Sequence, residues 1–115
     1  KKKKYTNRSE AIRDLIRHAL VEEEIKSNVE VVAVVSLLYN HHKRELSERL
    51  TELQHKHHHL VLSSMHVHLD HTNCLETIVM QCMSQEVKQL ADLLIVSKGV
   101  KHGKLSLTST GKNLD

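Results

Sequence analysis

Residues 63–80 read SSMHVHLDHTNCLETIVM, and the fold and chemistry expected of this chain follow from this stretch. His66 and His68 lie two apart among small and aliphatic residues, so on a β-strand both imidazoles project from one face. Residues 70–73, Asp-His-Thr-Asn, are typical of a turn, and Cys74 opens a second apolar run. The expected hairpin brings Cys74 back opposite His68, so that two imidazoles and one thiolate can converge.

Imidazole and thiolate donors indicate a transition-metal site, although three donors do not select the metal alone. Imidazole suits zinc, copper, nickel and iron, and thiolate shifts the preference toward softer ions. A structural zinc site usually shows paired Cys or His ligands, and this chain has no Cys-x-x-Cys. With one further nitrogen, the set suits planar Ni(II) or Cu(II). The alternative is that these histidines are ordinary surface or half-buried residues and the cysteine a small core side chain.

The remaining pattern predicts an α+β, ferredoxin-like domain. The apolar run Val31–Tyr39 is typical of a central strand buried on both faces. Ser84 is expected to cap a later helix, and Gly99 to end it as the C′ residue. We expect strands at 31–39, about 60–69, about 74–81 and 100–107, and helices at about 44–57 and 84–97. This β-α-β-β-α-β order is the split ferredoxin-like arrangement, with both helices on one face of the sheet.

A separate helix is expected before this domain. Asn7 and Glu10 have the spacing of a capping box, and the helix runs to about Glu24 with an apolar stripe that requires a partner. Lys1–Lys4 is either a solvated basic tail or a phosphate contact. We place the domain boundary between residues 28 and 29, where a short polar hinge lacks Gly and Pro.

Composition narrows the function classes. The formal charge of +3 is too small to argue nucleic-acid binding by itself. Cys74 and Cys82 lie at opposite ends of one expected strand, roughly 26 Å apart, whereas a disulfide needs Cα atoms within about 7 Å. Free thiols and the absence of a membrane span or signal peptide predict a cytoplasmic protein. No nucleophile is paired with a base, and a metal with four protein ligands leaves no substrate position, so we expect no enzyme.

With these motifs in place, the chain resembles the NikR family of nickel-responsive transcriptional regulators. The matching segments are residues 5–14, Tyr39-Asn40-His41, Leu53-Gln54-His55, His66-Val67-His68, Asn73-Cys74-Leu75-Glu76 and Lys98-Gly99-Val100-Lys101. The resemblance implies a partial ribbon-helix-helix segment at residues 1–28, for DNA binding and dimerisation. It also implies a ferredoxin-like (ACT-like) nickel-binding tetramerisation domain at residues 29–115.

The same resemblance implies site residues. Ni(II) at a tetramer interface would be bound by His66, His68 and Cys74 of one subunit and His55 of its neighbour. Residues that match the surroundings of that site are Gln54, Tyr39 and Glu76. Secondary metal binding is implied at His41, His57, His58 and His71, and a second cation position at Glu10 and Asp14. Arg8 matches a helix start that faces DNA phosphates.

Two departures from the family bear on function. In the family, a base-reading strand and a first helix precede the helix that contains Arg8, where this sequence has only Lys1–Lys4. We expect either that the native protein has this ribbon or that the molecule lacks sequence-specific DNA binding. Cys82-Met83 replaces a glycine-containing turn, and Cys82 has no assigned role.

The function expected is a homotetrameric nickel-sensing repressor whose partner is operator DNA, with no membrane partner. The first alternative is a nickel-binding module that stores or carries metal without binding DNA. A ferredoxin-like binder of a small metabolite comes last, because it leaves the histidines and cysteine unexplained.

Overall fold

The apolar stretches form one four-stranded antiparallel sheet with strand order β2-β3-β1-β4. The computed structural model describes residues 8–114. Its elements are α1 (Arg8–Lys26), β1 (Glu30–Asn40), α2 (Arg44–Lys56), β2 (Val61–His68), β3 (Asn73–Met83), α3 (Ser84–Ile95) and β4 (Val100–Ser109). The predicted ferredoxin-like order after the first helix is therefore confirmed. The expected cap at Asn7 and the basic run Lys1–Lys4 lie outside the described residues.

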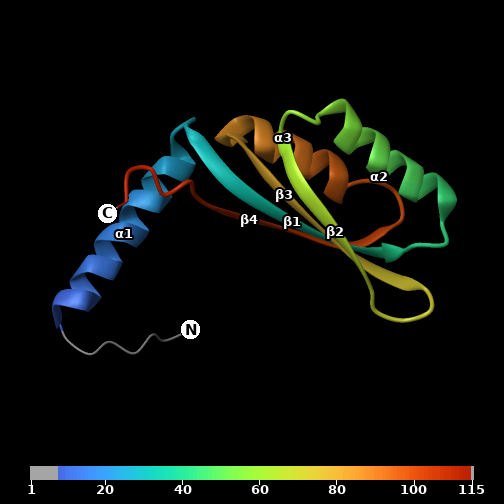
Figure 1. Cartoon of the computed structure of the whole chain (residues 1–115), viewed down its shortest axis with the longest axis horizontal. Coiled ribbons are helices and arrows are strands. Elements are labelled where there is room, and N and C mark those ends of the chain that lie inside the picture. The colour runs from blue at the N-terminus through green and yellow to red at the C-terminus, as the bar shows by residue number, and fades with distance from the viewer. Residues whose placement is uncertain (1–7, 115) are drawn as a thin grey trace.

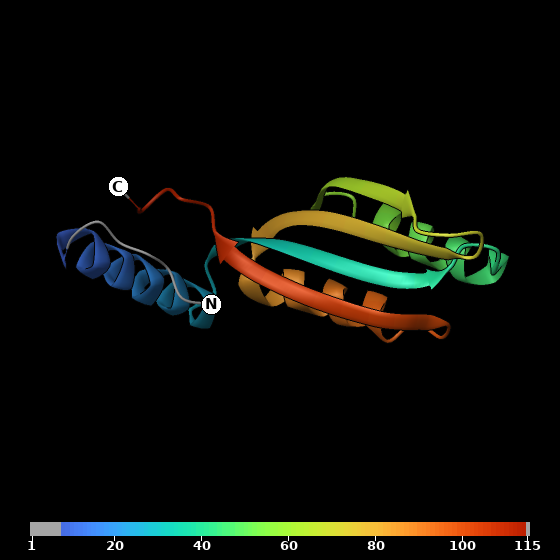
Figure 2. The same cartoon turned by 90° about the horizontal axis from the view of Figure 1, so that it is seen from below.

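Helices α2 and α3 cover one face of the sheet (Figure 2), and the core lies between these two layers. The buried strand residues alternate along β1 and β3, as expected where one face of a strand is covered. They pack against Leu46 and Leu50 of α2 and against Val87, Leu90 and Leu94 of α3.

The prediction that β1 is buried on both faces is wrong within this chain. Val32, Val34 and Leu38 alternate with the core residues and remain only half-buried. Within residues 8–114, no helix lies over the face on which they project (Figure 2). A run that is apolar on both faces predicts burial of both, but it does not say which molecule covers the second face.

The predicted helix caps need two corrections. The N-cap of α3 is Met83, which makes no side-chain cap, so Ser84 is the first helical residue and not the cap. Gly99 has the expected positive φ of 103°, but it follows Val96, the C-cap, by three residues. A Cβ at Gly99 would lie 3.0 Å from Leu46 Cδ2, so α2 also favours glycine there.

Helix α1 extends away from the sheet (Figure 1) and has no buried residue. Its large apolar side chains Ile12, Leu15, Ile16 and Leu20 are 45–69% exposed. The partner that the apolar stripe requires is thus not supplied by the described part of this chain. None of the helices within residues 8–114 combines the length and apolar character needed to cross a membrane.

Candidate metal centre

The β2–β3 hairpin brings together three of the predicted metal donors. His68 pairs with Cys74 and His66 with Glu76 in the antiparallel ladder. Cross-strand partners project from the same face of a sheet, and here that face is the one covered by helices. The predicted position of Cys74 opposite His68 is therefore confirmed, whereas the role of these residues as ligands stays a prediction.

The turn of this hairpin is held by Asp70. Its Oδ1 accepts the backbone N–H groups of Thr72 at 2.9 Å and Asn73 at 2.7 Å. These donors, those of Asn73 first, hold the pKa of the Asp70 carboxyl well below its ordinary value. Because the turn is fixed, the register that places Cys74 beside His68 is fixed with it.

A buried carboxylate lies beneath the donors. Glu76 is 2% exposed, and Tyr39 on β1 donates its hydroxyl to Glu76 Oε1 at 2.6 Å. Gln54 on α2 donates its Nε2 to Glu76 Oε2 at 2.7 Å. Burial, and then the neighbouring carboxylate, raise the pKa of Tyr39 far above its ordinary value, so the phenol remains a donor. Two elements, β1 and α2, thus hold Glu76 of β3 in one position, as a buried carboxylate requires.

The donor side chains differ in access to solvent. The side chain of His66 is 51% exposed, with Nε2 3.5 Å from Glu76 Oε2. The ring of His68 stacks on that of His41, with centroids 4.5 Å apart and planes inclined by 4°. Cys74 is fully buried, and burial first and the charge of Glu76 second raise the pKa of its thiol. The thiol therefore keeps its proton at neutral pH, and a metal must displace that proton to bind.

The donor types fit a borderline or soft divalent metal. Two imidazoles and one thiol share one face of a hairpin whose supporting carboxylate is already oriented. Within residues 8–114 of a single chain, no three His, Cys, Asp or Glu side chains lie close enough to enclose an ion. His66 and His68 face Glu76 and His41 instead, so rotation of the imidazoles would have to accompany metal binding.

His55, the fourth predicted ligand, lies apart from this hairpin. It is exposed and lines a shallow pocket of about 430 Å³ on the outer surface of α2, together with Ser47, Glu48, Thr51 and Glu52. The preceding residue, Gln54, faces Glu76. Successive residues on a helix point about 100° apart, so His55 is directed away from the hairpin of its own chain.

The histidines predicted to bind metal more weakly have protein partners. His41 Nε2 donates to the His71 carbonyl oxygen at 3.0 Å, and His42 Nε2 donates to the same oxygen at 2.9 Å. His57 and His58 donate Nδ1 to the Leu53 and His55 carbonyls, at 2.9 and 3.2 Å, and so satisfy acceptors at the C-terminal end of α2. The pairing of His42 with the hairpin was not predicted, and the adjacent His41-His42 dipeptide was its only signal in the sequence. Secondary metal binding stays a prediction.

The residues predicted for cation and DNA contact lie along α1. Glu10 and Asp14 line a surface pocket of about 300 Å³ together with Arg13 and Arg17. Arg8 is exposed at the start of the helix. No described feature tests their roles, which stay predictions.

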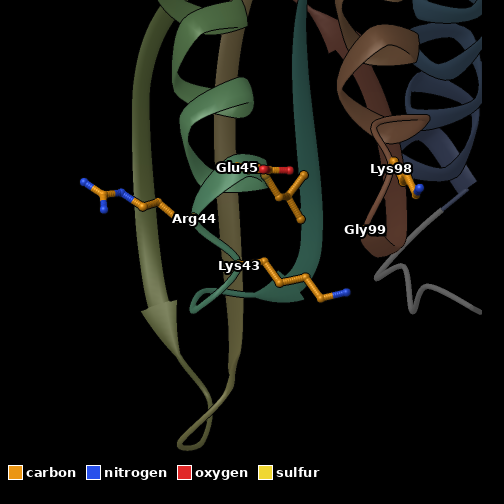
Figure 3. A pocket seen from close by; sticks show the side chains of 6 residues that line it. Lys43, Arg44, Glu45, Lys98 and Gly99 are labelled. Carbon is orange, nitrogen blue, oxygen red and sulfur yellow. The ribbon is translucent and has the colours of Figure 1, made fainter.

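A pocket that was not predicted lies where α2 begins. It has a volume of about 390 Å³ and is lined by Lys43, Arg44, Glu45, Leu46, Lys98 and Gly99. Lys43 extends toward the turn that carries Lys98 and Gly99, whereas Arg44 points away (Figure 3). Its lining contains no histidine or cysteine, so it is separate from the candidate metal centre.

The fold and the candidate site together indicate the class of protein. It is an α+β, ferredoxin-like domain whose edge hairpin carries imidazole and thiol groups suited to a metal. Residues 32–108 match the family model of the NikR C-terminal nickel-binding domain. The chain therefore belongs to the NikR family, and the metal that it binds is nickel.

Its relatives agree with this assignment. A "Putative nickel-responsive regulator" of Trichlorobacter lovleyi is 58% identical over 109 residues, which are 94% of this chain and 78% of the relative. A protein of the same name from Geotalea uraniireducens is 58% identical over 97% of this chain and 81% of its own length. Another, from Solibacter usitatus, is 55% identical over 96% of this chain and 80% of its own length.

Proposed function

We propose that this chain is a nickel-sensing transcriptional repressor in which Ni(II), bound at a subunit interface, is coupled to operator DNA binding. The observation that carries the proposal is the β2–β3 register, which sets Cys74 beside His68 and His66 beside the buried Glu76. Membership of the NikR family supplies the metal. The family name is that of regulators and not of a class of enzymes.

The metal ligands in this proposal are His66, His68 and Cys74 of one subunit and His55 of a neighbour. The outward position of His55 on α2 supports a ligand shared between copies, because it faces away from its own hairpin. Bound nickel would supply a cross-link between two subunits. Glu76, held by Tyr39 and Gln54, would accept the ring N–H of His66 and orient that imidazole.

Two apolar surfaces support association into a tetramer. The bare face of the sheet carries half-buried Val32, Val34 and Leu38, which a second copy would cover. The exposed apolar stripe of α1 would pair with another α1, leaving Arg8 at the helix start for DNA phosphate. Nickel would favour the arrangement of α1 pairs that fits the operator, which is coupling between two sites.

A nickel titration monitored by visible absorption tests the metal site. The protein should give thiolate-to-nickel bands that saturate near one metal per chain, and Cys74→Ala should abolish them. Cys82→Ala is the matched control, because Cys82 is the chain's other free thiol and lies at the far end of β3. Bands that survive in Cys74→Ala, or that disappear equally in Cys82→Ala, would refute the ligand set.

Mixing two inactive variants tests whether each site is shared between subunits. Separately, the His55→Ala and Cys74→Ala proteins should each bind nickel weakly. When the two proteins are unfolded, mixed and refolded together, the intact hairpin of the His55→Ala subunit can lie next to the intact His55 of a Cys74→Ala subunit. Part of the tight nickel binding should then return. His59→Ala, which alters an exposed histidine of the same cluster that is not among the predicted ligands, should bind like the parent protein. No recovery on mixing would refute the shared site.

The DNA part of the proposal is tested with the protein as its gene encodes it. Selection from a pool of random DNA duplexes should enrich a defined sequence with nickel and not with a chelator. Tight nickel binding without nickel-dependent enrichment would instead favour the metal store or carrier.

A further inference from the structure

The short junction between α1 and β1 is fastened to the start of α3. The backbone N–H of Ser84 donates to the Val29 carbonyl at 2.8 Å, and the Ser84 hydroxyl donates to the Ile25 carbonyl at 3.0 Å. The backbone N–H of Gln85 donates to Asn28 Oδ1 at 3.1 Å. The first turn of a helix leaves N–H groups without intrahelical partners, and α3 has no capping side chain of its own. Asn28 therefore supplies from the junction the oxygen that a local cap would otherwise provide.

The C-terminal tail fastens the same junction from a second direction. After β4 the chain continues beyond the sheet, on the side where α1 lies (Figures 1 and 2). Lys112 Nζ lies 2.8 Å from Glu30 Oε1, at the start of β1. Asn113 Nδ2 donates to Glu24 Oε2 at 3.5 Å, in the last turns of α1. These contacts join the segment after β4 to the last turns of α1 and to the start of β1, on the two sides of the junction.

The fastened arrangement also carries a cost. Among the described side chains, Glu24 Oε1 is shielded from solvent and has no hydrogen-bond partner. An unsatisfied buried oxygen opposes the arrangement that buries it. Helix α1 itself has no buried residue, so no apolar core offsets this cost. Apart from the half-buried Val21, which lines a surface pocket with Leu107 and Thr108 of β4, the direction of α1 is set by polar contacts.

We infer that these contacts form a clasp that sets the direction of α1 relative to the sheet and opens to let α1 turn. The clasp consists of the pairs Asn28–Gln85, Ser84–Ile25, Lys112–Glu30 and Asn113–Glu24. The inference deepens the proposed function and rests on it only for its regulatory consequence. The clasp lies between the segment proposed to bind DNA and the sheet that carries the proposed metal donors, so it is placed to couple a change in one to the other.

Distances between two spin labels test the clasp without nickel or DNA. Labels at Arg13→Cys on α1 and Glu52→Cys on α2, both at exposed positions, report the direction of the helix. The background is the full chain with Cys74→Ser and Cys82→Ser, diluted with unlabelled protein so that only distances within one chain are measured. The clasp predicts one narrow distance peak, which Asn28→Ala should broaden. Asn28→Asp keeps an oxygen that accepts from a helix start and should keep the narrow peak.

The tail provides a second variant that does not touch α3. The double variant Lys112→Met, Asn113→Ala should also broaden the distance peak. If circular dichroism shows that Asn28→Ala is unfolded, this double variant provides the test. Glu23→Ala, on the exposed side of the same helical turns, should leave the peak unchanged. A broad peak in the parent chain, or the same narrow peak in both clasp variants, would overturn the inference.

The regulatory consequence is measured separately, with both native cysteines present. The Asn28→Ala protein should bind nickel as tightly as the parent. In the selection from random DNA duplexes, however, nickel should increase the enrichment of the bound sequence less for this variant than for the parent. Failure of the proposed function would appear in the nickel and DNA measurements of the parent protein and would leave the distance result intact. Unchanged nickel dependence in a variant whose peak has broadened would overturn the regulatory role of the clasp.

Discussion

Replacing Tyr39 by Phe removes one hydroxyl from beneath the candidate metal centre and leaves the ring in place. The lost group donates at 2.6 Å to Glu76, a residue that is 2% exposed. Because the ring volume is retained, no large cavity contributes to the effect. The change therefore isolates a single buried hydrogen bond to a carboxylate.

The structure sets the expected magnitude. A hydrogen bond to a charged group contributes about 1.5–3 kcal/mol, and leaving its partner buried without a donor adds to the loss. Gln54 still donates to the other oxygen of Glu76, so the carboxylate keeps part of its stabilisation. We expect Tyr39→Phe to lower the free energy of unfolding by about 2 kcal/mol.

The assay is urea unfolding followed by circular dichroism, with a chelator present and protein concentration held constant, because oligomers gain stability with concentration. Thr72→Val is the control. Its hydroxyl lies 3.3 Å from Asp70 Oδ1 at an exposed position, and we expect a change within about 0.5 kcal/mol. A Tyr39→Phe protein as stable as the parent would refute the reasoning and would mean that water reaches Glu76.

Other predictions concern the metal, the core and the tail. Nickel binding should release the proton of the Cys74 thiol, whose pKa is raised, so nickel affinity should increase with pH at pH values below that pKa. In a weakly buffered nickel titration, the Cys74→Ala protein should release about one proton fewer than the parent. Gly103→Ala should lower the free energy of unfolding by about 1–3 kcal/mol, because the new Cβ would lie 2.7 Å from Ile95 Cγ1. Adding Ile95→Ala to Gly103→Ala should cost less than the sum of the two single changes, and strict additivity in urea unfolding would contradict this contact. Lys112→Met should raise the pKa of Glu30 toward its ordinary value in an NMR titration. The pKa of Glu30 is lower in the folded state than in the unfolded state, so ionised Glu30 stabilises the fold at pH values above its unfolded pKa. That contribution is lost as the pH falls through the folded-state pKa. The difference in the free energy of unfolding between Lys112→Met and the parent should therefore vanish in acid.

Local sequence patterns predicted most of the helices and strands, and also the hairpin that places Cys74 opposite His68. Alternation around His66 and His68 and the turn residues before Cys74 depend on neighbours only a few positions away. The hairpin register could therefore be predicted before its partners were known. The same holds for helices whose apolar residues recur every three or four positions, such as Val87, Leu90 and Leu94 in α3.

Other features arise from residues far apart in the chain. The cap of α3 was assigned by local rule to Ser84, whereas the capping oxygen comes from Asn28, 57 residues before its Gln85 donor. The run Val31–Tyr39 is apolar on both faces, and its composition does not tell which face its own helices cover.

The amino-acid sequence by itself determined the order of elements, the family and the donor types on the hairpin. Only the tertiary structure decided how those donors are supported and directed. Glu76 receives its hydrogen bonds from Tyr39 and Gln54, 37 and 22 residues away, and His55 is turned outward by the face of α2 that meets the core. The physical reason is that periodicity and turn formation are properties of neighbouring residues, whereas the burial of a charge and the direction of a side chain depend on which elements pack together.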